Sequence, residues 1–160
     1  MRFTLIKDLK QDKSMNPIMS GLLVFTLLYL LTDIFVKQNV FGLSRIAIKL
    51  TLYGDEEQFI EPLNQASFLE FIHTEIFFMM MLLLTLSAVF ARLSAKKTYS
   101  LWIINSTLLS AIVSLITLSL SYFLSALYID LYVFTYFLWH LLAFYMATYS
   151  LWNLNFAKNI

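Results

Sequence analysis

The sequence predicts an all-α integral membrane protein, a four-helix bundle with up-down-up-down topology. Apolar residues make up 60% of the 160-residue chain and charged residues 13%, whereas a soluble domain has about 45–50% and about 25%. Four apolar stretches are each long enough to cross a hydrocarbon core, which takes roughly 20 helical residues. The length suits one domain. We therefore predict a single transmembrane domain over residues 1–160.

The membrane-spanning helices are predicted from the apolar stretches and from the residues that precede them. Asn16 precedes Pro17, as a capping residue precedes a proline in the first turn. Ser67 and Glu70 have the spacing of a capping box, and Asp130 is placed to cap the last helix. The four predicted spans are 17–36, 68–91, 99–124 and 131–154.

The predicted extracytoplasmic loop, 37–66, contains a second kind of pattern. Within 41–53 the apolar residues fit either one face of a helix lying at the membrane interface or the alternation of a strand. We favour the short interfacial helix, because an isolated strand beside a bilayer leaves its edges unpaired. Gly54 is suited to end that helix.

The lysines and arginines predict the orientation, because cytoplasmic loops carry an excess of them. Three of these residues, Lys37, Arg45 and Lys49, lie in the loop between the first two helices. The other side has eight: Arg2, Lys7, Lys10, Lys13, Arg92, Lys96, Lys97 and Lys158. We expect a multi-pass protein of a bacterial cytoplasmic membrane with cytoplasmic N- and C-termini.

The two histidines are the first candidates for chemistry. His73 is expected about 9 Å and His140 about 15 Å from the outer face, on helices that run in the same direction. Two imidazoles at such depths can reach one haem b iron, provided both face the interior. The plainer interpretation is that His140 forms a hydrogen bond across the bundle and that His73 is hydrated.

Acidic residues near the outer face suggest two further sites. Glu70 and His73 have the i, i+3 spacing of bundle metal sites, and with Asp33 and Asp130 they form a hypothetical metal site at the outer mouth. Asp33 and Glu75 are ionisable residues inside predicted spans, which are often functional. Lys37, one turn from Asp33, is its simplest partner. Glu75 and His73 are about 200° apart around their helix, so they cannot both face the bundle.

The third span carries a stripe of small hydroxylated residues. Residues of this kind allow close helix packing, and we favour that role over the lining of a polar path. The stripe comprises Ser106, Ser110, Ser114, Thr117 and Ser121.

The sequence contains no nucleotide, phosphate-loop or hydrolase motif, and an enzymatic role is not favoured. The absence of cysteine removes thiolate chemistry, and the net charge of +1 does not indicate nucleic acid. The leading hypothesis is an accessory or scaffold subunit, embedded in the lipid bilayer and in contact with other membrane subunits or further copies of itself. The alternatives are a haem b electron-transfer subunit, with His73 and His140 as ligands, and a proton- or cation-coupled transport protein.

Overall fold

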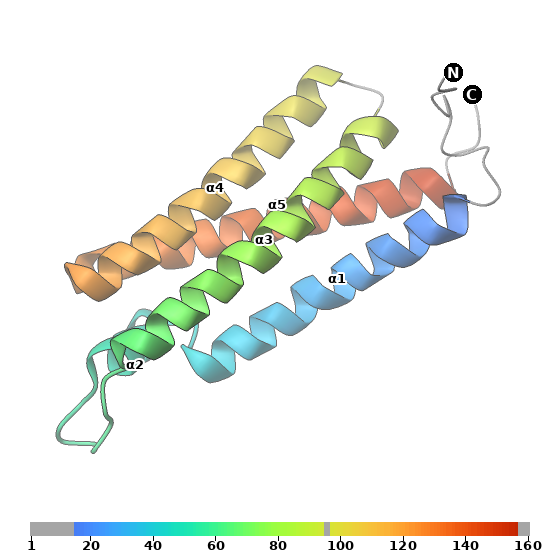
Figure 1. Cartoon of the computed structure of the whole chain (residues 1–160). Coiled ribbons are helices and arrows are strands. Elements are labelled where there is room, and N and C mark those ends of the chain that lie inside the picture. The colour runs from blue at the N-terminus through green and yellow to red at the C-terminus, as the bar shows by residue number, and fades with distance from the viewer. Residues whose placement is uncertain (1–14, 95–96, 157–160) are drawn as a thin grey trace.

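The computed structural model describes residues 15–94 and 97–156, and within these ranges the regular structure is helical (Figure 1). Four of the helices are long and apolar enough to cross a membrane. The predicted all-α bundle, with a short helix between the first two long ones, is confirmed. The helices are α1 (Met15–Val40), α2 (Arg45–Tyr53), α3 (Gln65–Leu93), α4 (Lys97–Phe123), the short 3-10 helix η1 (Ala126–Tyr128) and α5 (Ile129–Asn155).

The long helices alternate in direction, and α5 contacts each of the other three. Where α1 begins and α5 ends, the side chains of Ser20 and Asn155 are hydrogen-bonded. At the same end, Asn153 donates to the carbonyl of Leu93 at the end of α3. The opposite end carries α2 and the loop that follows it (Figure 1). The order of the elements along the chain therefore agrees with the predicted up-down-up-down topology.

The capping roles predicted for Asn16, Ser67 and Asp130 are wrong, because the helices extend further toward the N-terminus than expected. Asn16 lies inside α1. Asn64, not Ser67, caps α3, and its side chain accepts from the Ser67 amide at 2.9 Å. Asp130 lies in the first turn of α5, which follows η1 directly. At α3, Asn64 and Ser67 are both residues that can cap a helix, so the sequence alone does not choose between them.

The loop between α1 and α3 folds onto the end of the bundle. Ser44 caps α2 by accepting from the Ala47 amide, and Gly54 ends it with a φ of 73°, as predicted. Ile48 and Leu52 are buried. A strand would place Ile46 on the same face as Ile48 and Leu52, but Ile46 is 74% exposed. A helix turns Ile48 and Leu52 toward the bundle and Ile46 away from it.

The hydroxylated stripe lies largely inside the bundle. Ser110, Ser114, Thr117 and Ser121 are buried, whereas Ser106 is exposed. The buried hydroxyls donate to carbonyls of their own helix, as in the 2.7 Å bond from Ser121 to Leu118. Small side chains whose polar groups are satisfied locally let α4 pack closely on α5.

The orientation prediction rests largely on residues that the structure leaves undescribed. Within the described ranges, Arg92 lies at the end of α3 that is opposite to α2. Arg2, Lys7, Lys10, Lys13, Lys96 and Lys158 lie outside the described residues.

Candidate functional site: a buried network of ionisable residues

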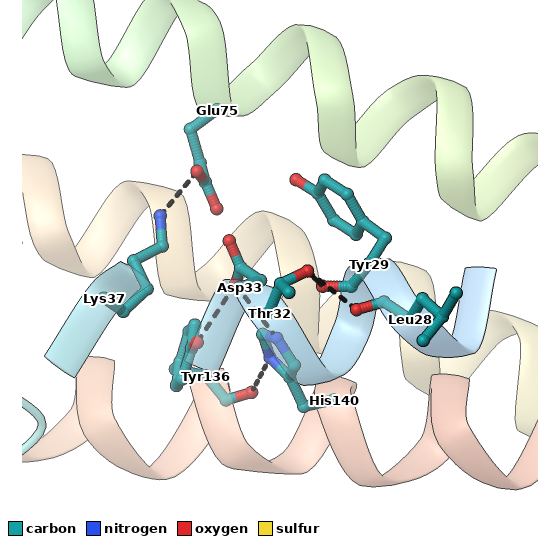
Figure 2. Close-up of polar contacts among 8 residues, drawn as sticks. All are labelled: Leu28, Tyr29, Thr32, Asp33, Lys37, Glu75, Tyr136 and His140. Atoms are coloured by element: carbon teal, nitrogen blue, oxygen red, sulfur yellow. Dashed lines mark hydrogen bonds and ion pairs between the residues drawn. The ribbon is translucent and has the colours of Figure 1, made fainter. Parts of the chain in front are cut away.

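Five ionisable side chains from three helices meet inside the bundle (Figure 2). Asp33 and Lys37 come from α1, Glu75 from α3, and Tyr136 and His140 from α5. As whole residues, none of the five is more than 9% exposed. Charged groups buried in a membrane segment are costly unless they are paired, so these contacts decide what the site can do.

The first half of the network is an ion pair between α1 and α3. The Nζ atom of Lys37 lies 2.5 Å from Oε2 of Glu75. The same Nζ atom lies 4.1 Å from the centroid of the Phe71 ring, one turn before Glu75 on α3. The ammonium group is thus held by a carboxylate and by the negative face of an aromatic ring.

The second half joins α1 to α5. The Oδ2 atom of Asp33 accepts a hydrogen bond from the Tyr136 hydroxyl at 3.0 Å and lies 3.1 Å from Nε2 of His140. The other ring nitrogen of His140, Nδ1, lies 3.1 Å from the carbonyl oxygen of Tyr136. The imidazole is packed against Tyr136 and Trp139, with ring centroids 4.2 and 3.7 Å away. Its position is therefore fixed by polar contacts and by packing.

Asp33 and Lys37 lie one turn apart on the same face of α1 but reach different helices, as Figure 2 shows. The sequence suggested that they pair with each other. In the structure Lys37 instead satisfies Glu75, and Asp33 is satisfied by α5. The i, i+4 spacing was the signal in the sequence, because two residues at this spacing lie on the same face of a helix and so both face the bundle if one does.

The two histidines are not brought together. Glu75 faces the interior, and His73 is exposed on the other side of α3, as their angular separation requires. His140 is buried, with Asp33 beside its Nε2. The geometry therefore supplies one interior imidazole, whereas the haem hypothesis needs two that converge.

The four residues of the hypothetical metal site are also separated. Glu70 is exposed, and Asp130 forms a surface ion pair with Arg45, while Asp33 is inside the bundle. Among the described residues, no three histidine, aspartate or glutamate side chains are placed to hold one metal ion.

Tyr136 and Lys37 are members of the network that sequence reasoning did not assign to a site. Tyr136 stands one turn before His140 on the stripe of α5 that includes Tyr132, Ala143 and Ala147, all buried. That stripe was the available signal, since a tyrosine one turn from a buried histidine can reach the same partner. Two ionisable pairs joined in this way can hold helices in register and can bind or release protons.

Four long apolar helices, three of which contribute to a paired, buried charge network, define a multi-pass membrane protein of the helical-bundle class. The chain belongs to the Aq_1264_TM family, a transmembrane helical domain whose model matches residues 42–160. The match includes α2, α3, α4 and α5, whereas Asp33 and Lys37 on α1 precede it. No curated protein and no solved structure matches the chain.

Proposed function

We propose that this protein is an accessory or scaffold subunit that acts through contacts between its helices and those of a membrane complex or homo-oligomer. The observation that supports the proposal is the separation of its polar and apolar groups. Ionisable residues of α1, α3 and α5 pair with one another inside the bundle. The outward faces of these helices carry large exposed apolar side chains such as Phe25, Phe78 and Leu141, which can pack against neighbouring helices as well as against lipid.

Two apolar grooves flank α3 and provide surfaces for such contacts. The groove between α1 and α3 has a volume of about 270 Å³, and its lining includes Phe25, Phe78 and Thr85. The groove between α3 and α4 has a volume of about 240 Å³ and includes Met80 and Ile112. Flexible methionines and large aromatic rings accommodate the side chains of a packed helix well.

The same proposal includes the orientation and the compartment. The eight-to-three distribution of lysine and arginine supports a cytoplasmic location for both termini. We infer a bacterial cytoplasmic membrane as the location. Alkylation of single cysteines, introduced at Ser94 between α3 and α4 and at Glu57 in the loop after α2, tests the orientation. A membrane-impermeant reagent applied to intact cells should label position 57 and not position 94.

Site-specific photocrosslinking in native membranes tests the scaffold proposal. A benzophenone side chain at position 85 or 112 probes the two grooves, and Leu141, exposed on α5, is the matched position outside both of them. We expect discrete protein adducts from at least one groove position and none from position 141. If all three positions yield lipid adducts alone, the proposed role in helix contacts is wrong.

A further inference from the structure

Both ring nitrogens of His140 face oxygen acceptors (Figure 2). A carbonyl oxygen can only accept, so Nδ1 must carry a proton to bond to the carbonyl of Tyr136. The contact between Nε2 and Oδ2 of Asp33 also needs a proton. Without it, the lone pair of a ring nitrogen and the lone pairs of a carboxylate would face each other at 3.1 Å.

We propose that Asp33 and His140 together form a proton-binding site, which holds one proton beyond those of a neutral imidazole and a carboxylate. The proton is on Nε2, giving an imidazolium and a carboxylate, or on Oδ2, giving a neutral imidazole and a carboxylic acid. Both forms contain the same number of protons and the same net charge of zero. The proposal goes beyond the scaffold function and does not depend on it.

The surroundings of the pair favour the bound proton. The ionisable neighbours are Tyr29 and Lys37 on α1, Glu75 on α3, and Tyr132 and Tyr136 on α5. Lys37 and Glu75 compensate each other, and the Tyr136 hydroxyl donates to Asp33. With the proton, the whole network is neutral. Without it, one uncompensated negative charge would remain among buried residues, which is costly in a membrane interior.

The site lies between two helices, which gives the proton a structural consequence. Asp33 belongs to α1 and His140 to α5, so loss of the proton turns an attractive contact between the helices into a repulsive one. Binding of the proton therefore favours the docked position of α1. Of these two helices, α5 lies within the residues that match the family model and α1 precedes them.

Nitrogen NMR of the full chain labelled with [15N]histidine tests the proposal directly, because the chain has only two histidines. His73→Gln assigns the signals. The spectrum is recorded at pH 8, where free imidazole and carboxyl groups are largely deprotonated. Infrared difference spectra between the unmodified protein and Asp33→Asn report whether Asp33 is a carboxylic acid, and Glu75→Gln is the matched control for the other buried carboxyl group.

Two outcomes support the proposal: a doubly protonated His140 ring beside an ionised Asp33, or a neutral ring beside a carboxylic acid at Asp33. A neutral His140 ring together with an ionised Asp33 would overturn it. If Asp33→Asn does not fold, isotope labelling of the aspartate carboxyl groups in the unmodified protein gives the same infrared information. Failure of the crosslinking experiment would leave this result unaffected.

Discussion

Lys37 of α1 and Glu75 of α3 form an ion pair in the interior of the bundle, with 2.5 Å between Nζ and Oε2 and side chains 3% and 11% exposed. Arg45 and Asp130 are also 2.5 Å apart, but these side chains are 57% and 54% exposed. The two pairs have the same separation and opposite environments. They therefore allow the effect of burial on an ion pair to be measured within one protein.

The buried pair should be strongly sensitive to removal of one partner. Lys37→Met leaves the Glu75 carboxylate without compensation, and we expect a loss of about 3–5 kcal/mol in the free energy of unfolding. Lys37→Met combined with Glu75→Gln removes both charges and should recover most of that loss. Denaturant unfolding in detergent micelles measures both effects. Arg45→Met is the control and should cost about 1 kcal/mol or less; equal losses at Lys37 and Arg45 would contradict the argument from burial.

Gly54 should not tolerate alanine. Its φ is +73°, and an added Cβ would lie 2.6 Å from the carbonyl oxygen of Ile60. We expect Gly54→Ala to lower the free energy of unfolding by about 1–3 kcal/mol through backbone strain and to loosen the loop after α2. Gly21→Ala is the matched control, because an added Cβ meets no atom within 4 Å there. That change should be neutral or stabilising by up to about 1 kcal/mol.

Trp139 is fully buried, yet its indole N–H has no hydrogen-bond partner among the described residues. Trp139→Phe removes this unsatisfied donor and keeps an aromatic ring beside His140. We expect the gain from removing the unsatisfied donor to offset the cost of the smaller ring within about 1 kcal/mol of the free energy of unfolding. Trp139→Ala, which leaves a cavity, should cost about 3–5 kcal/mol. Thermal unfolding of both variants measures these effects: a phenylalanine variant as unstable as the alanine variant would contradict the expected offset.

The contact between Tyr53 and α4 should depend on alkaline pH. The Tyr53 hydroxyl donates to the carbonyl of Ser121, and burial raises the pKa of Tyr53 above its ordinary value of 10.0. A raised pKa in the folded state means that this contribution to stability is fully present below pH 10 and is lost as pH rises further. The stability difference between the unmodified protein and Tyr53→Phe should therefore be constant at neutral pH and change only above pH 10. A change between pH 6 and pH 8 would contradict this assignment.

Local features of the chain were predictable from the sequence. The four long helices follow from the length of their apolar stretches, and the end of α2 at Gly54 follows from the backbone freedom of glycine. The caps were not predictable in the same way. Asn64 and Ser67 are both good capping residues three positions apart, so the sequence alone does not choose between them, and in the structure Asn64 is the cap.

The sequence by itself determined that the chain is a helical membrane protein and that His73 and Glu75 must face different directions, because helix geometry sets the angle between them. Only the tertiary structure decided which of the two faces the interior, because that depends on how α3 is rotated against its neighbours. It likewise paired Lys37 with Glu75 and Asp33 with His140. The relative direction of two side chains on one helix follows from their spacing in the sequence. Contacts between side chains on different helices depend on how those helices pack.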